Sequence, residues 1–200
     1  MAVHGFQRQL EWSDFREVEK SLDGKHDAGF QPRYGWNCRT LTDRQTGDWR
    51  VTSATVSIQP NSANTWVVKG KKSNELLIHE QGHYDICAIG ARMIEAKLRA
   101  LTGRKAESSD LKVDATGFSV AGKRAADGQL LQAGLVDQVQ DLYDSDPVCG
   151  TDHSRDKTNQ AIWTIRIKHV HADPKGTLED LNFCIPASLL TPFCGTSIGL

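Results

Sequence analysis

A long amphipathic stretch, residues 73–101, constrains the fold more than any other part of this chain. Its apolar residues recur at three- and four-residue intervals, and they are Leu76, Ile86, Cys87, Gly90, Ile94, Leu98 and Leu101. This spacing predicts a helix with one buried face. Ser73 or Asn74 can cap the start of the helix, and Gly103 follows its end as a C-cap. Two histidines lie within the same apolar stripe, and buried imidazoles need partners for their ring nitrogens.

These two histidines belong to the sequence His79-Glu80-Gln81-Gly82-His83. Four residues are about one helical turn, so both imidazoles project from the same face and can bind one metal ion. Glu80 lies about 100° around the helix from His79, where its carboxylate can meet a metal-bound water instead of the metal. A pair of hydrogen-bonded core histidines is the alternative, but the adjacent carboxylate favours a metal site. We therefore expect His79 and His83 to bind Zn2+.

The sequence around this motif resembles a bacterial family of uncharacterised predicted zinc-dependent proteases, the DUF922 family. The most specific part of the resemblance runs from Leu76 to Ile86 and continues with Ala91-Arg92. Further stretches match in the same order, upstream at residues 10–15 and 62–67 and downstream at residues 143–144, 151–153 and 160–163. The resemblance covers roughly residues 8–168, and it implies a zincin-like fold and peptidase activity without indicating a particular substrate.

A catalytic zinc site usually has three protein ligands and a water, so the two histidines need a third partner. In the family, a Tyr-Asp pair is followed by Thr-x-His-Gly, and then by Gln seven residues past the His with Trp three further on. Here His153 precedes Gln160 by seven residues, and Trp163 follows at the matching distance. The resemblance therefore implies His153 as the third ligand, with an insertion at residues 147–150. Without that insertion, Cys149 would occupy the ligand position.

The remaining roles follow from metal-assisted hydrolysis of an amide. Glu80 is expected to act as the general base that takes the water's proton. The oxyanion needs a second donor besides zinc, for which Tyr143 is the candidate and Tyr84 a weaker alternative. Asp85 points away from the two histidines and is a candidate for orienting an imidazole from behind. No role beyond that of exposed or loop histidines is expected for His4, His26, His169 and His171.

The N-terminal third has the pattern of β-structure. Residues 33–42 and 49–58 contain alternating apolar and polar positions, and Thr46-Gly47-Asp48 between them suggests a hairpin connection. In zincin-like folds, the strand before the metal helix commonly forms one lip of the cleft. The resemblance therefore implies a substrate groove beside residues 49–58, where an extended peptide can add by main-chain hydrogen bonds.

After the long helix, residues 111–120 are strand-like and residues 129–143 form a second amphipathic helix. Residues 158–168 fit a helix or a strand, and the resemblance favours a helix. No Pro- or Gly-rich linker divides the chain, so we expect one α+β, zincin-like domain over residues 1–200. Its parts would be an N-terminal β-sheet (about 1–70) packed on the metal-binding helix (about 73–102) and a mainly helical C-terminal part (103–200).

Composition excludes some partners. The 24 basic and 25 acidic residues nearly balance and form no basic stripe, which argues against a nucleic-acid partner. No stretch approaches the ~20 apolar residues that a bilayer requires, so membrane insertion is not expected. The start lacks the apolar core of a secretory signal, which indicates a cytoplasmic protein as written or the mature part of an exported one. Of the five cysteines, Cys184 and Cys194 could close a small disulfide loop in an oxidising compartment.

The sequence thus predicts a zinc metalloprotease that hydrolyses a polypeptide substrate, while its oligomeric state stays open. Two alternatives remain. One is a catalytically silent metal-binding interaction protein on the same scaffold, against which Glu80 argues because a structural site needs no base. The other is a zinc amidase that acts on a non-protein substrate such as a cell-wall amide. The motif specifies how water is activated and not which pocket surrounds it, so the sequence does not separate peptide from non-peptide substrates.

Overall fold

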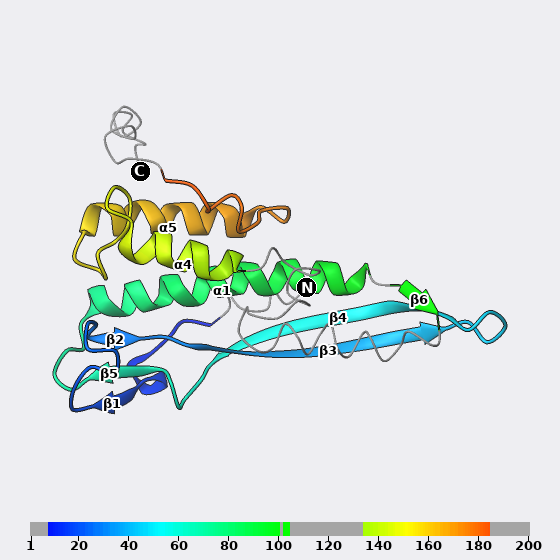
Figure 1. The fold of residues 1–200 in the computed structure, drawn as a ribbon, viewed down its shortest axis with the longest axis horizontal. Coiled ribbons are helices and arrows are strands. Elements are labelled where there is room, and N and C mark those ends of the chain that lie inside the picture. The colour runs from blue at the N-terminus through cyan, green and yellow to red at the C-terminus, as the bar shows by residue number, and fades with distance from the viewer. Residues whose placement is uncertain (1–7, 101, 105–133, 185–200) are drawn as a thin grey trace, which may run out of the picture.

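The computed structural model describes residues 8–100, 102–104 and 134–184. The described part contains a short 3-10 helix (Trp12–Asp14), strands β1 (Arg16–Val18), β2 (Ala28–Gly29), β3 (Pro32–Thr42), β4 (Asp48–Pro60), β5 (Trp66–Val68) and β6 (Thr102–Arg104), and helices α1 (Asn74–Arg99), α4 (Leu135–Ser145) and α5 (Lys157–Ala172). Figure 1 shows α1 in the middle, with the strands on one side and α4 and α5 on the other. The fold class is α+β, as the sequence predicts.

The long central helix begins where the sequence places it. Ser73 is its N-cap, and its hydroxyl accepts a hydrogen bond of 3.1 Å from the backbone N–H of Leu76. The helix ends at Arg99, after which the N–H of Ala100 donates to the carbonyl of Ala96. Gly103 lies in β6 and pairs with Trp49, so the prediction that it caps the helix is wrong.

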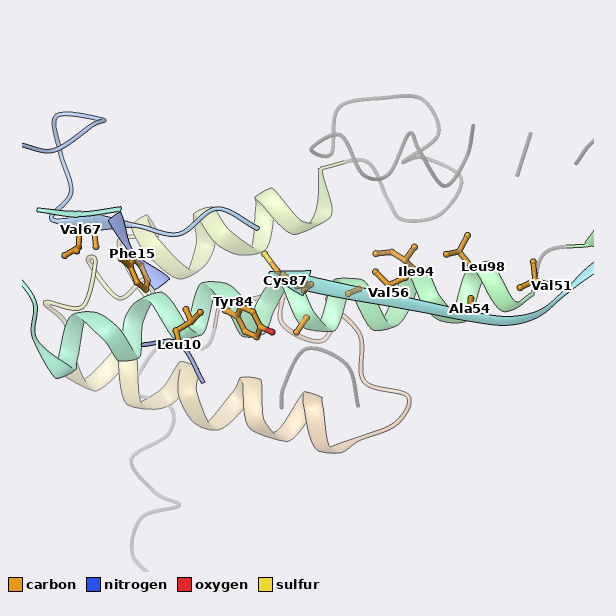
Figure 2. Packing of buried hydrophobic residues seen from close by; sticks show 14 of the residues in the cluster. Leu10, Phe15, Val51, Ala54, Val56, Val67, Tyr84, Cys87, Ile94 and Leu98 are labelled. Atoms are coloured by element: carbon orange, nitrogen blue, oxygen red, sulfur yellow. The ribbon is translucent and has the colours of Figure 1, made fainter. Parts of the chain in front are cut away.

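Strands β3 and β4 form a long antiparallel hairpin that confirms the predicted strands. The pairing runs from Pro32 opposite Pro60 to Thr42 opposite Trp49, and β6 extends this sheet along β4. Gly47 adopts a φ of +79° in the connecting turn, a left-handed conformation that glycine adopts without strain. Alternate β4 side chains pack against the C-terminal half of α1, and Figure 2 shows Ala54, Val56, Ile94 and Leu98 in this core.

A second sheet lies beside the N-terminal half of α1. Its strand order is β1-β5-β2, with β1 parallel and β2 antiparallel to the central β5. Val67 in β5 is fully buried, and Phe15 and Leu10 belong to the same core. Strand β2 is therefore at an edge of this sheet, and the site described below lies next to it.

Helices α4 and α5 cover the other side of α1. Their buried side chains meet Ile86 and Ile89 of α1 in a second core that includes Leu135, Val139, Tyr143, Trp163, Ile167 and Val170. The predicted helix at residues 158–168 is confirmed by α5. Helix α4 overlaps the predicted helix at 129–143, whose first residues lie outside the described ones, as does the strand expected at 111–120.

A disulfide joins the loop between α4 and α5 to the end of the described chain. It links Cys149 to Cys184, whereas the sequence suggested a pair between Cys184 and Cys194. Cys194 lies outside the described residues. The backbone carbonyl of Cys149 also accepts a 2.7 Å hydrogen bond from the indole of Trp163, which holds this loop against α5. Within the described part of the chain, no helix has the length and apolarity to cross a membrane.

Candidate metal centre

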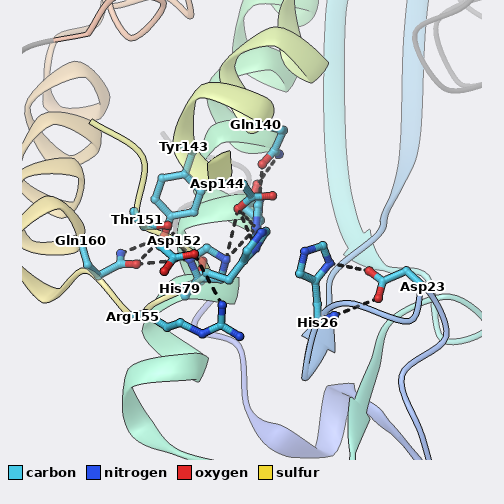
Figure 3. A network of polar contacts seen from close by, with 12 residues as sticks. Asp23, His26, His79, Gln140, Tyr143, Asp144, Thr151, Asp152, Arg155 and Gln160 are labelled. Carbon is cyan, nitrogen blue, oxygen red and sulfur yellow. Dashed lines mark hydrogen bonds and ion pairs between the residues drawn. The ribbon is translucent and has the colours of Figure 1, made fainter. Parts of the chain in front are cut away.

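The two histidines of α1 converge with a carboxylate from α4. The Nε2 atoms of His79 and His83 are 3.1 Å apart. Oδ1 of Asp144, near the C-terminal end of α4, lies 3.2 Å from Nε2 of His79 and 2.9 Å from Nε2 of His83 (Figure 3). Zinc binds imidazole nitrogen and carboxylate oxygen at about 2.0–2.2 Å. The three side chains therefore form a group that could hold a metal ion.

The outer ring nitrogens of both histidines have acceptors behind them. Nδ1 of His79 lies 3.3 Å from Oε1 of Gln160 and 3.2 Å from the hydroxyl of Thr151. Nδ1 of His83 contacts Oε1 of Gln140. An Nδ1–H that donates to an amide oxygen leaves the lone pair on Nε2, which is the nitrogen that faces Asp144. This is the tautomer that a metal ligand requires, so the donor set fits a metal ion.

The electrostatics of the cluster also fit a cation. Burial lowers the pKa of His79 to about 4. Burial would lower the pKa of His83 as well, but the charge of Asp144 outweighs it and raises that pKa to about 9. Burial would raise the pKa of Asp144, yet His83 and His79 hold it well below its ordinary value. The cluster thus pairs the negative carboxylate of Asp144 with a positive charge on His83. A bound metal ion would supply this positive charge instead.

Glu80 lies beside this cluster and is only 2 % exposed. Its Oε2 atom has no hydrogen-bond partner among the described residues. Burial raises the pKa of this carboxyl to about 7. A buried carboxylate oxygen without a partner is costly and points to a functional role. The side chain lines a cavity of about 810 Å³ together with His79, His83 and Asp144.

The cavity has a different wall from the one expected. None of residues 48–60 lines it, so the prediction of a groove beside residues 49–58 is wrong. Strand β4 packs on the C-terminal half of α1, whereas the histidine motif is in the N-terminal half. The wall facing the motif consists instead of residues 26–34, which include β2 and the start of β3.

His153 lies next to the cluster, but it is farther from the two histidines than Asp144 is. Its Nδ1 is 3.7 Å from Oδ1 of Asp144, and its ring centre is 5.8 Å from that of His79. Three consecutive residues, Asp152, His153 and Ser154, have positive φ angles of 44°, 50° and 74°. Such left-handed conformations are strained for residues other than glycine and are tolerated where the surroundings enforce them. Cys149 is in the disulfide and offers no free thiolate.

The hydroxyl of Tyr143 is directed toward α1 and away from the cavity. It donates to the backbone carbonyl of His79 at 3.0 Å and accepts from the amide of Gln160 at 2.8 Å. The phenol ring also stacks on the His79 imidazole, with ring centres 4.9 Å apart. Tyr143 does not line the cavity, and its hydroxyl is engaged on both sides, so the expectation that it donates to an oxyanion does not fit the structure. Its contacts instead position His79.

The other two candidates also lie away from the cavity. Tyr84 is buried and packs edge-on against Phe30, with ring centres 5.7 Å apart. Asp85 accepts a 2.8 Å hydrogen bond from the amide of Gln81, whose own oxygen accepts from the N–H of Leu10. These contacts hold the N-terminal segment on α1. They do not orient an imidazole, so the role expected for Asp85 does not match the structure.

Gly82, the fourth residue of the motif, allows Tyr143 to approach α1. A β-carbon at this position would lie 2.5 Å from Cζ of the phenol and closer still to its oxygen. We expect Gly82→Ala to destabilise the fold by about 1–3 kcal/mol, because overpacking must displace a buried ring. Denaturant unfolding would measure this loss.

The matched control is Gly90→Ala on the same helix. There the nearest atoms are the side-chain ends of Val136 and Leu178, at 3.3 and 3.4 Å. These ends can move slightly, and alanine favours the helix by about 1 kcal/mol, so little net loss is expected. Equal losses in the two variants would show that the Tyr143 contact does not explain the glycine of the motif.

Several residues of this site were not anticipated as such from the sequence. Asp144 and Gln160 stand in the stretches that resemble the family, but nothing in the pattern marked them as partners of the histidines. Gln140 carries no motif signal at all. His26, expected to be an ordinary loop histidine, lines the cavity. Of the remaining histidines, His169 is exposed on α5, His171 is half-buried, and His4 lies outside the described residues.

Comparison with known proteins adds no further constraint. No protein-family model matches the chain, and no curated protein or solved structure is significantly similar to it. The functional conclusion therefore depends on the geometry of the site.

Proposed function

We propose that this protein is a zinc-dependent metallopeptidase with a zincin-like arrangement of its metal helix. The observation that carries the proposal is the convergence of His79, His83 and Asp144 at the wall of a large cavity, beside the buried carboxylate of Glu80. Its Oε2 atom has no hydrogen-bond partner among the described residues. A purely structural metal site does not need a second carboxylate beside its ligands, whereas hydrolysis needs a base.

His79, His83 and Asp144 would hold the ion, with Gln160 and Gln140 fixing the orientation of the two imidazoles. A zinc ion bound there would lower the pKa of a water ligand to about 7 and polarise the scissile carbonyl. The sequence resemblance assigns the third position to His153, and its proximity to Asp144 makes it the rival for that position.

Glu80 would accept the proton from the attacking water and deliver it to the leaving amine. A general base works best when its pKa lies near the working pH. Burial brings the pKa of Glu80 to about 7, which suits both the acceptance and the later release of a proton.

A polypeptide is the substrate class that the cavity wall favours. Ala28 and Gly29 form β2, an edge strand of the β1-β5-β2 sheet, and both line the cavity. An edge strand offers main-chain donors and acceptors to which an extended peptide can add as a further strand. The cavity volume of about 810 Å³ accommodates several side chains of such a peptide.

We expect the zinc-loaded protein to cleave unstructured polypeptides in a reaction that a zinc chelator stops and added zinc restores. Mass spectrometry of a broad peptide library would detect the products and give the cleavage preference. The absence of chelator-sensitive cleavage throughout the library would refute the peptidase assignment. The same assay on cell-wall fragments then separates an amidase from a catalytically silent metal-binding protein.

A further inference from the structure

The proposed reaction requires a second donor to the oxyanion besides the metal, and Tyr143 is not available for it. His26 lies across the cavity from α1 and lines it together with Asp23 and His153. Figure 3 shows His26 between Asp23 on one side and the cluster around His79 and Asp144 on the other. This placement makes His26 a candidate for contact with a substrate bound over the metal cluster.

Asp23 holds His26 in a defined orientation. Oδ2 of Asp23 lies 2.5 Å from Nδ1 of His26. Oδ1 of the same carboxylate accepts hydrogen bonds from the hydroxyl of Ser21 at 2.7 Å and from the backbone N–H groups of Lys25 and His26 at 2.9 and 3.0 Å. Gly24, with a φ of +75°, allows the tight turn that brings these groups together. The loop therefore fixes the Asp23 carboxylate independently of its contact with the His26 ring.

The Asp23 carboxylate and the loop around it hold the His26 ring in one orientation. Burial would raise the pKa of Asp23, but the hydrogen bonds from Ser21 and from the backbone and side chain of His26 hold it well below its ordinary value. A carboxylate that accepts from Nδ1–H keeps the imidazole from rotating and leaves Nε2 on the far side of the ring. None of the described residues hydrogen-bonds to Nε2 of His26, so this nitrogen can meet a substrate.

His153 supports the ring from the other side. The ring centres of His26 and His153 are 3.7 Å apart, with an angle of 41° between the planes. His153 in turn is 3.7 Å from Asp144, so the stack connects the Asp23 loop to the metal cluster. The three left-handed residues at 152–154 place His153 in this stack. Their backbone strain is consistent with a functional requirement for the position of this ring.

We propose that His26 is a second catalytic residue, whose Nε2–H donates a hydrogen bond to the carbonyl oxygen as it becomes an oxyanion. The inference rests on the proposed hydrolysis. In that reaction the water oxygen bonds to the carbonyl carbon, the water proton passes to Glu80, and the carbonyl π pair moves to the oxygen. His26 stabilises this oxygen without giving up its proton. The C–N bond then breaks, and Glu80 returns the proton to the amine.

Arg155 is the main competing donor at this wall. It also lines the cavity, but its side chain is 68 % exposed and pairs with Asp152 at 3.5 Å. A water-exposed guanidinium that changes partner easily is less preorganised than an imidazole fixed on both sides. The structure therefore favours His26, and the comparison of the two variants tests this choice.

We expect His26→Ala to lower kcat by about 10²–10³-fold, the usual loss for one oxyanion donor. KM should change less than about threefold and the zinc content should not change, because the contact forms mainly in the transition state. Lys25→Ala on the same loop is the matched control, since it keeps the backbone N–H that Asp23 accepts. This control should keep the wild-type kcat. A larger kcat loss in Arg155→Ala than in His26→Ala would overturn the proposal.

Asp23 is a positioning residue, and a graded pair of variants tests it. Asp23→Asn keeps Oδ1 for the backbone N–H groups, but its amide group cannot accept from Nδ1–H of His26. We expect kcat to fall by roughly tenfold or more and KM to stay unchanged, with partial rescue in Asp23→Glu. Nitrogen NMR of the His26 ring in the metal-free protein should show a hydrogen-bonded Nδ1–H that Asp23→Asn loses. An unchanged ring spectrum would contradict the Asp23 contact.

A phosphinic peptide gives a readout that does not depend on turnover, because it imitates the tetrahedral oxyanion. His26→Ala should weaken its binding to the zinc-loaded protein by about 10²–10³-fold. Binding of the matching uncleaved peptide, measured in the Glu80→Gln background, should weaken less than about threefold. Equal losses for both ligands would overturn the proposal. An inactive wild type would refute the proposed function, whereas an active wild type with an equally active His26→Ala variant would refute this inference alone.

Discussion

Replacing Glu80 by Gln is expected to reduce peptide hydrolysis by about 10²–10⁴-fold while zinc content and fold are retained. Gln is nearly isosteric with Glu but cannot accept the proton of the attacking water. The carboxyl is buried and does not belong to the converging group of His79, His83 and Asp144, so its loss should not remove the metal. Initial rates with a cleavable peptide and zinc analysis of the same sample would measure both effects.

Glu75→Gln is the matched control for this change. Glu75 lies five residues earlier on the same helix and is exposed, so the same loss of charge occurs away from the cavity. Its rate should equal that of the wild type. If Glu80→Gln hydrolyses peptides as fast as this control, Glu80 is not the general base. The metal-binding protein without turnover would then be the better interpretation.

The second large effect is expected from replacing one of the proposed metal ligands. Groups that only support a ligand typically contribute about 10–100-fold to metal affinity. We therefore expect His79→Ala, His83→Ala and Asp144→Ala each to weaken zinc binding by more than ~100-fold. Gln140→Ala should fall within about 10–100-fold, because its amide oxygen only contacts Nδ1 of His83. Competitive titration with a zinc chelator of known affinity would measure these constants.

The same titration decides between the two candidates for the third position. Since His153 lies 3.7 Å from Asp144, we expect His153→Ala to weaken zinc binding by about 10–100-fold, as Gln140→Ala does. The opposite order, a loss above ~100-fold for His153→Ala and a small one for Asp144→Ala, would restore the assignment that the sequence resemblance implies. Circular dichroism of the metal-free variants is the control, because ligands also stabilise the native state.

Local features of the site could be read from the sequence because they depend on neighbouring residues. The spacing of His79 and His83 and the cap at Ser73 depend only on the pitch of a helix and the hydroxyl next to its first turn. Alternation likewise identified the two long strands, whose side chains point to opposite faces. These periodicities act within a few residues, so no tertiary contact is needed to predict them.

Placement of the strands around the helix could not be read in this way. Alternation shows that β4 has one buried face, but it does not show which half of α1 that face covers. The packing of Ala54 and Val56 near Ile94 and Leu98 places β4 away from the motif. The two-residue strand β2 is too short for a periodic signal, and it lines the cavity instead.

What the sequence by itself determined is therefore helix α1, the spacing of its two histidines and Glu80, and the α+β class. The tertiary structure alone decided what completes the site. Asp144 reaches the histidines only because α4 packs on α1, and Gln140 meets His83 across 57 residues of sequence. His26 comes from a loop on the opposite wall of the cavity. Such contacts arise from the burial of apolar faces between elements distant in the chain, for which local patterns carry no information.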